Sequence, residues 1–216
     1  MLICGIDEAG RGPLIGPMVM CAVKIRKEDE QKLVALGVKD SKLLTAKTRE
    51  FLYDKIIEIA KGYEIAIVEP HEIDAAVFSQ TSNLNWLEAT TSAKLLNVLK
   101  PDSAILDCPS PNIKAYHDFV NKLLEKKLDM TCAHHADRDF VVVGAASIIA
   151  KVTRDAEVEK IRKKIGKDFG SGYLTDPKMK GFAEKYWDKY PEIFRHSWAP
   201  YMKLAGLKKQ KKLDSY

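Results

Sequence analysis

Hydrophobic and polar positions along the chain predict strands and helices in alternation. The runs MLICGI (1–6) and MVMCAVKI (18–25) are almost wholly apolar, so they predict two strands joined through a glycine-rich bend as a hairpin. The segment YEIAIVEP (63–70) alternates at period two and stops at its proline, which is typical of a third strand. Shorter strands are predicted for SAILD (103–107) and DMTCAHH (129–135).

Helical spacing fills the intervals between these strands. The segment 45–61 places Leu52, Ile56 and Ile59 on one stripe behind Thr45, which is suited to an N-cap. The other predicted helices cover 83–99, 112–127 and 141–165, and a helical tail follows the Gly, Asp and Pro residues of 170–177. The order predicts an α/β fold with one central sheet and a C-terminal helical extension. We expect a catalytic part over 1–175 and the extension over 176–216.

Composition narrows the class of protein. The 216 residues are 46% hydrophobic and 30% charged, as in globular proteins. The longest apolar runs fall short of the roughly 18 residues of a membrane span, and Asp7 and Glu8 interrupt the first run, unlike a signal peptide. We therefore expect an intracellular, cytoplasmic protein. The four cysteines form no C-x-x-C pair and indicate neither a zinc ribbon nor disulfides, and CAHH (132–135) lacks a second ligand cluster.

The positive charge of the chain is concentrated in its tail. Residues 1–175 carry 25 Lys/Arg and 25 Asp/Glu, whereas residues 176–216 carry 10 and 5. Eight of the 18 aromatic residues also lie in the tail. A basic, aromatic segment suits nucleic acid, because cations meet phosphates and rings stack on bases. The alternative is a helical cap with its aromatic residues in a core, since Phe182, Tyr186 and Tyr190 recur at helical spacing.

Acidic residues gather where the predicted strands end. Asp7 and Glu8 follow the first strand, and Asp107 ends the SAILD strand. The ends of neighbouring strands open into one crevice of an α/β sheet. Asp137 precedes a helix whose first residues are small (144–147), which lets that helix approach the sheet and bring Asp137 near the other acids.

Two interpretations of these acids are open. An aspartate at a strand end often caps a helix or lies in a solvated turn. Converging carboxylates instead repel one another and need a counter-charge, which Mg²⁺ or Mn²⁺ supplies because hard cations prefer oxygen ligands. Two such ions about 4 Å apart support phosphodiester cleavage.

The glycine-rich bend GRGPLIG (10–16) is not a nucleotide-binding loop of a common type. Its glycine spacing differs from G-x-G-x-x-G, it leads to a strand and not to a helix, and it lacks the Gly-Lys-Ser/Thr of a P-loop. What remains is a bend whose backbone N–H groups, beside Arg11, can approach a substrate closely.

Six blocks of the sequence resemble, in order, the motifs of type 2 ribonuclease H. They are GIDEAGRGPLIGPMV (5–19), VKDSKLLT (38–45), ILDCP (105–109), HADRDFVVVGAASIIAKVTRD (135–155), GSGYLTDP (170–177) and RHSWAP (195–200). The resemblance spans nearly the whole chain and implies the ribonuclease H-like fold, a mixed five-stranded sheet flanked by helices. The short form is similar to the single-chain enzyme of archaea, which implies a monomer.

The resemblance also implies a metal site. The four metal-binding carboxylates of the family fall on Asp7, Glu8, Asp107 and Asp137. Asp139 is a near neighbour of Asp137, but the family's acid lies eight residues before the first alanine of the following helix, which favours Asp137. These residues would hold two Mg²⁺ or Mn²⁺ ions.

Further positions match substrate contacts of the family. Gly10, Arg11 and Gly12 match the element that contacts the 2′-hydroxyl and neighbouring phosphate of a ribonucleotide, and Tyr173 matches the tyrosine against the same sugar. Lys42, Ser147 and Lys151 match positions near substrate phosphates, although Lys42 could be merely solvated and Ser147 a packing residue.

Two departures from the family pattern bear on local loop geometry. The chain has Gly-Tyr-Leu at 172–174 where Gly-Tyr-Pro is common, and His-Ala-Asp at 135–137 where Lys-Ala-Asp is frequent. Neither removes a metal ligand.

The implied activity is that of a metal-dependent endoribonuclease. It would cut the RNA strand of RNA/DNA hybrids, and single ribonucleotides within duplex DNA, leaving 3′-hydroxyl and 5′-phosphate ends. The type 3 relative shares the Asp-Glu opening but typically has an extra N-terminal domain, for which Met1 leaves no room. A non-catalytic nucleic-acid adaptor is the alternative from another class.

The last seven residues suggest a protein partner. Gln210, Leu213 and Tyr216 follow the spacing Q-x-x-L-x-x-aromatic, which resembles a sliding-clamp docking peptide without its second aromatic residue. The alternative is a frayed basic terminus.

Overall fold

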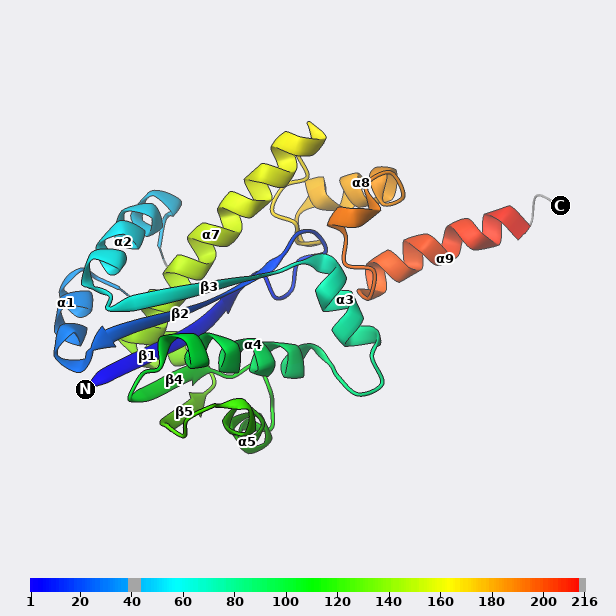
Figure 1. Ribbon diagram of the computed structural model, residues 1–216. Helices are drawn as coiled ribbons and strands as arrows, with labels where there is room; N and C mark the ends of the chain where they lie inside the picture. Colours follow the sequence, from blue (N-terminus) through cyan, green and yellow to red (C-terminus); the bar gives the residue numbers. More distant parts are fainter. Residues whose placement is uncertain (39–43, 214–216) are drawn as a thin grey trace.

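A mixed five-stranded sheet forms the centre of the molecule (Figure 1). The computed structural model describes residues 1–38 and 44–213, with side chains up to residue 206. The strands are β1 (Leu2–Ala9), β2 (Met18–Arg26), β3 (Gly62–Val68), β4 (Ser103–Asp107) and β5 (Asp129–Ala133). Their order in the sheet is β3-β2-β1-β4-β5, with β1, β2 and β3 antiparallel and β1, β4 and β5 parallel. The predicted hairpin and the mixed sheet are both confirmed.

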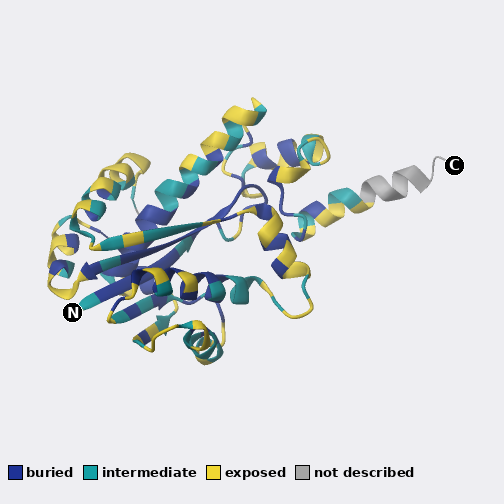
Figure 2. Cartoon of the chain, viewed as in Figure 1, coloured by how far each residue is buried: buried dark blue, intermediate teal, exposed yellow. Residues whose placement is uncertain are grey.

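Helices cover both faces of this sheet (Figure 1). One face carries α1 (Glu30–Ala35), α2 (Ala46–Ile59) and α7 (Val141–Ile165), and the other carries α4 (Leu84–Leu99) and α5 (Ile113–Leu123). Strand β2 is almost wholly apolar up to Val23 because alternate residues enter the two cores: Val19 packs under α7, whereas Met20 packs on the α4 side. Both layers of buried residues are visible in Figure 2.

Helix α7 crosses the sheet at unusually short range because β1 has a glycine at the crossing. A Cβ atom on Gly5 would lie 2.4 Å from the backbone carbon and oxygen of Val142. The small residues at the start of the helix, from Gly144 to Ser147, are all buried there. The predicted close approach of this helix to the sheet is therefore confirmed.

The C-terminal segment packs on the end of the sheet through a separate apolar cluster. It contains α8 (Pro177–Tyr186), a short 3₁₀ turn η3 (Pro191–Ile193) and α9 (Ala199–Leu213). Most of its aromatic residues pack inward, with Phe182 and Phe194 against Leu14 and Ile15 of the glycine-rich bend. The division at residue 175 stays a prediction. No described helix has the length and apolar character needed to cross a membrane.

Several elements differ from the predictions. Helix α3 (Pro70–Phe78) begins where the sequence indicated only the end of a strand, because Pro70 occupies the first helical position inside a capping box made by Glu69 and Glu72. Helix α1 and the turn η1 (Lys27–Asp29) were not predicted. The helix predicted to reach 127 ends at Leu123, and β5 ends at Ala133 before the short helix α6 (Ala136–Asp139).

Candidate active site

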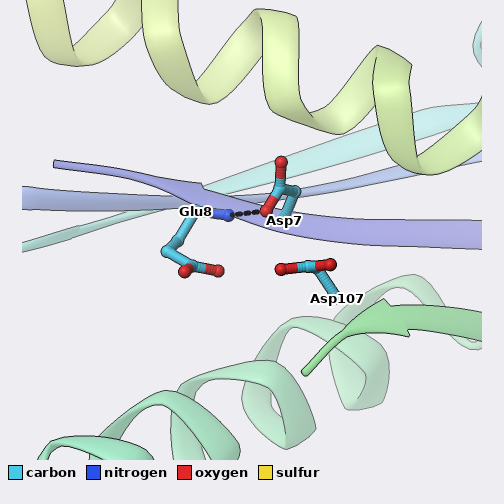
Figure 3. Close-up of side chains that lie close together, drawn as sticks. All are labelled: Asp7, Glu8 and Asp107. Carbon is cyan, nitrogen blue, oxygen red and sulfur yellow. Dashed lines mark hydrogen bonds between the residues drawn. The ribbon is translucent and has the colours of Figure 1, made fainter. Parts of the chain in front are cut away.

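Three of the four predicted acids converge at the ends of two adjacent parallel strands. Pairing of Ile6 in β1 with Leu106 in β4 places the next residues, Asp7 and Asp107, side by side. Together with Glu8 they offer one ligand oxygen each, all within 4.8 Å of one another. Figure 3 shows Glu8 and Asp107 facing each other between β1 and β4, with Asp7 beside them on β1.

The fourth acid is linked to this group through the backbone of α6. The amide of Ala136 donates a hydrogen bond of 2.7 Å to Oδ1 of Asp107, and Asp137 is the next residue. The side chain of Asp137 is buried, but its carboxylate lies outside the three-acid group. The structure therefore joins Asp7, Glu8 and Asp107 directly and brings Asp137 alongside Asp107.

The electrostatics of the group favour a cation. Burial raises the pKa of Asp7 well above its usual value, and the charges of Glu8 and Asp107 raise it further, while hydrogen bonds from Ser147 and the Glu8 amide oppose the shift. Burial, followed by the charges of Glu88 and Asp107, raises the pKa of Glu8 to about 8. An all-oxygen donor set that resists ionisation on its own fits a hard divalent cation such as Mg²⁺ or Mn²⁺.

A cavity of about 200 Å³ opens beside two of these acids. Its lining contains two of the predicted metal ligands, Asp7 and Glu8, and most of the predicted substrate contacts: Gly10, Arg11, Gly12, Ser147, Lys151 and Tyr173. These residues come from β1, the glycine-rich bend, α7 and the turn before α8, so the fold gathers what the sequence separates by more than 160 positions.

The glycine-rich bend lies close to Tyr173. Gly10 has a φ of 81°, and a Cβ atom there would lie 2.9 Å from the carbonyl oxygen of Pro17, so glycine is required. Gly12 faces the ring of Tyr173, whose nearest carbon is 3.5 Å from an ideal Cβ position. The Leu14 amide donates to the carbonyl of Gly172 at 2.9 Å and ties the bend to the turn that carries Tyr173.

The side chain of Arg11 is held by α4. Its Nε donates to Oε1 of Glu88 at 2.8 Å, and its Nη2 donates to Oδ1 of Asn85 at 2.8 Å. Glu88 is fully buried, and burial raises the pKa of its carboxyl to about 7 against the opposing charge of Arg11. The guanidinium therefore anchors the bend to α4.

Comparison with known proteins identifies the family. The family model described as Ribonuclease HII matches residues 4–201, which include every block quoted above. The chain belongs to the ribonuclease HII family. It is accordingly an endoribonuclease, as the shared name of its curated relatives states.

Relatives and solved structures of ribonuclease HII align over almost the whole chain. The Ribonuclease HII of Pyrococcus furiosus is 42% identical and aligns over 98% of this chain and 95% of its own length. The crystal structure of the ribonuclease H2 from Pyrococcus horikoshii matches with a TM-score of 0.86 at 39% identity, covering 94% of this chain and 97% of that one. A complex of PCNA with the RNase HII of Archaeoglobus fulgidus matches with a TM-score of 0.83 at 35% identity, covering 92% and 95%.

Two buried arginines of this ribonuclease HII were missed by the sequence analysis. Arg154 of α7 lines the cavity, with its guanidinium 5.9 Å from the centre of the Tyr173 ring and its Nε about 3.0 Å from a Cβ position on Gly10. Arg195 lies beneath the bend. Both occur inside blocks that resemble the family, but nothing in their local pattern separates them from solvated arginines.

The remaining predicted residues have mixed outcomes. Lys151 lines the cavity, and its Nζ pairs with Asp155 at 2.5 Å. Ser147 is both buried and part of the lining. Lys42 lies outside the described residues, as do Tyr216 and the side chains of Gln210 and Leu213. Among the described residues, Asp7, Glu8 and Asp107 are the only group of three potential metal ligands, so the CAHH segment forms no such group.

Proposed function

We propose that this ribonuclease HII is a metal-dependent enzyme that cuts the RNA strand of RNA/DNA hybrids and also cuts at single ribonucleotides within duplex DNA. The products would carry 3′-hydroxyl and 5′-phosphate ends. One observation carries this proposal: Asp7 and Glu8 belong both to the acidic group and to the lining of the cavity that contains the glycine-rich bend and Tyr173. The place for a cation is therefore next to the place for a sugar.

Four acids would hold the metal: Asp7, Glu8 and Asp107 in the compact group, and Asp137 beside it. Two Mg²⁺ or Mn²⁺ ions held there would supply an activated water and would stabilise the departing oxygen of a phosphodiester. The raised pKa values of Asp7 and Glu8 in the protein alone support this assignment, because the charge of a bound cation would offset the cost of burying their negative charges together.

Recognition of ribose would use the backbone of the bend and the ring of Tyr173. The 2′-hydroxyl is the group that distinguishes RNA from DNA at a single nucleotide, and it both donates and accepts hydrogen bonds. A Cβ atom on Gly12 would lie 3.5 Å from the ring of Tyr173, so the backbone of the bend and this ring would form adjacent walls around one sugar. Ser147 and Lys151, on the α7 side of the cavity, would contact phosphates, as would Lys42.

A cleavage assay on a duplex with one embedded ribonucleotide tests the proposal. Incision at that nucleotide in Mg²⁺ or Mn²⁺, and none in EDTA, is the expected result. Cutting of long hybrids alone would assign type 3 specificity, and binding without incision would assign the adaptor function. An all-DNA duplex of the same sequence is the control.

A sliding clamp is the protein partner that we propose. The match to the complex of PCNA with RNase HII from Archaeoglobus fulgidus supports this partner, and the Q-x-x-L-x-x-aromatic spacing of the last residues supplies a candidate peptide. The first part of this peptide, from Gln210 to Leu213, forms the end of α9, which extends away from the sheet (Figure 1).

A further inference from the structure

The guanidinium of Arg195 is buried under the glycine-rich bend without a carboxylate partner. The residue has no exposed surface, and its side chain donates to the carbonyl oxygens of Gly10, Arg11 (2.7 Å) and Gly16 (3.1 Å). No ion pair joins it to an acid within 4.0 Å in the described part of the chain. Burying a cation costs several kcal/mol of dehydration free energy, so stabilisation of the fold does not by itself explain why Arg195 is buried. Its three carbonyl partners point to a role in the shape of the bend.

The segment that carries Arg195 is itself fixed at several points. Asp74 of α3 accepts hydrogen bonds from the amides of His196 and Ser197 at 2.8 Å each, and from the Ser197 hydroxyl at 2.6 Å. The backbone amide of Arg195 donates to the carbonyl of Leu14 at 3.0 Å. The guanidinium is therefore presented from a rigid base.

The carbonyl contacts determine where two amides of the bend point. In a planar trans peptide the C=O and the following N–H point in opposite directions. Because the carbonyls of Gly10 and Arg11 turn toward Arg195, the amides of Arg11 and Gly12 turn away from it. Neither amide has a hydrogen-bond acceptor among the residues that the structure describes, and both residues line the cavity.

We infer that Arg195 is a positioning residue for ribose recognition: by binding the Gly10 and Arg11 carbonyls, it holds the Arg11 and Gly12 amides ready for the ribose of the substrate. This inference rests on the proposed function, because it takes the ribose site as given and explains only what holds the bend in the shape that the site needs. Asp74 acts one step further back, by holding the segment that carries Arg195.

The test compares recognition of ribose with binding of the duplex as a whole. Arg195→Lys keeps a positive charge but replaces the planar fork, which spans three carbonyls, with a single ammonium group. Two quantities are measured: kcat and KM on a duplex with one ribonucleotide, and the inhibition constant of an all-DNA duplex of the same sequence. We expect kcat/KM to fall at least tenfold, while the inhibition constant and the affinity for Mn²⁺ change less than twofold.

A second variant protects the test against a folding defect. Asp74→Asn leaves the bend and the Arg195 side chain unchanged and loosens only the segment that carries Arg195, so we expect a smaller fall in kcat/KM at an unchanged inhibition constant. Arg49→Lys is the matched control, since Arg49 also donates to a carbonyl, that of Leu44 at 2.6 Å, on the α2 side of the molecule.

The outcomes separate this inference from the proposed function. If Arg195→Lys retains the wild-type kcat/KM, or if kcat/KM and duplex binding weaken by the same factor, Arg195 has no specific role in ribose recognition. If Arg195→Lys does not fold, the same comparison on Asp74→Asn decides the matter. Failure of the wild-type protein to incise at the ribonucleotide would instead overturn the proposed function.

Discussion

Asp107 is the residue that joins the two parts of the acidic site. It lies within the three-acid group and accepts the amide of Ala136, beside Asp137. Asp107→Asn keeps an oxygen for that amide but removes a negative charge, so we expect cleavage to fall by about 10³-fold or more while the melting temperature is unchanged or higher. Asp102→Asn is the matched control, because Asp102 accepts the Leu2 amide at the opposite end of the same strand region. Full activity in Asp107→Asn would remove this residue from the metal site.

The raised pKa of Glu8 predicts a pH dependence of stability in the metal-free protein. The folded state keeps the Glu8 proton up to a pKa of about 8, whereas the unfolded chain releases it near 4.5. The stabilising contribution is therefore complete below about 4.5 and is lost as the pH rises toward 8. We expect the free energy of unfolding of the wild type, relative to Glu8→Gln, to decrease between pH 5 and pH 8 in EDTA. Urea titrations at both values measure this difference, and a pH-independent difference contradicts the shift.

Metal binding should show the opposite trend over the same range. A cation binds the ionised carboxylates, so Mn²⁺ competes with protons at Asp7 and Glu8. We expect Mn²⁺ affinity, measured by calorimetry, to rise from pH 5 to pH 8, and Glu8→Gln to lose the part of this dependence that Glu8 causes while keeping the part due to Asp7. An affinity that is constant with pH would argue against these two ligands.

Asp7, Glu8 and Asp107 could be predicted from the sequence because they lie at the ends of apolar strands. Asp137 could be predicted because it precedes a helix of small residues and because the family blocks fix its spacing. Arg195 and Glu88 could not. Their roles depend on partners 185 and 77 positions away, and no periodicity records such a contact. Arg11 was predicted as part of the bend that contacts the substrate, without a distinction between its backbone and its side chain, and the structure has its side chain bonded to Glu88 and Asn85 of α4. The sequence indicated which residues matter at the bend but not which of their atoms are available.

At the scale of elements, the crossing of α7 over β1 sets the distance between the acids and the α7 side of the cavity. Gly5→Ala would place a methyl group 2.4 Å from the backbone of Val142, and backbone cannot rotate away as a side chain can. We expect a loss of about 3 kcal/mol of stability, the upper part of the range for overpacked cores. Urea unfolding measures it, together with a fall in activity as Ser147 and Lys151 move away from Asp7.

A matched glycine gives the contrary expectation. Gly181 lies inside α8, and a Cβ atom there would meet nothing within 4 Å. Gly181→Ala should therefore stabilise the protein by about 1 kcal/mol, the helix propensity difference between the two residues. Equal effects of the two substitutions would show that α7 does not depend on a close approach to β1.

Helices long enough to repeat their apolar spacing over several turns were predicted well, and short helices were not. The spacing in 45–61 indicated α2, and Thr45 does accept the Thr48 amide as its N-cap. Helix α1 has six residues and α3 nine, so each offers too few turns for a periodic signal. Pro70 was interpreted as the end of a strand, but proline also suits the first turn of a helix, and the Glu69 and Glu72 pair that settles the matter acts through side-chain hydrogen bonds.

For the whole molecule, the C-terminal segment connects the substrate site to the tail. The apolar cluster around Phe182 and Phe194 includes Leu14 and Ile15 of the bend, and Trp198 donates to the carbonyl of Gly12 at 3.3 Å. Helix α9 begins at the next residue, Ala199. The same segment therefore holds the bend and starts the helix that leads to the basic terminus.

The arrangement predicts that clamp binding and cleavage can be separated by truncation. A chain ending at Lys209 loses Gln210, Leu213 and Tyr216 but keeps every residue that contacts the bend. We expect it to lose binding to the sliding clamp in a pull-down with the purified proteins. Its kcat/KM on a short duplex with one ribonucleotide should stay within about twofold of the full chain, because Lys208 and Lys209 remain to meet phosphates.

A full-length variant with Leu213→Ala and Tyr216→Ala keeps all the tail lysines, so it separates the effect of the docking side chains from the effect of charge. Equal clamp binding by the full chain and both variants would show that the terminal peptide is not the docking site, whereas loss in the truncated chain alone would assign the binding to Gln210 or the lysines.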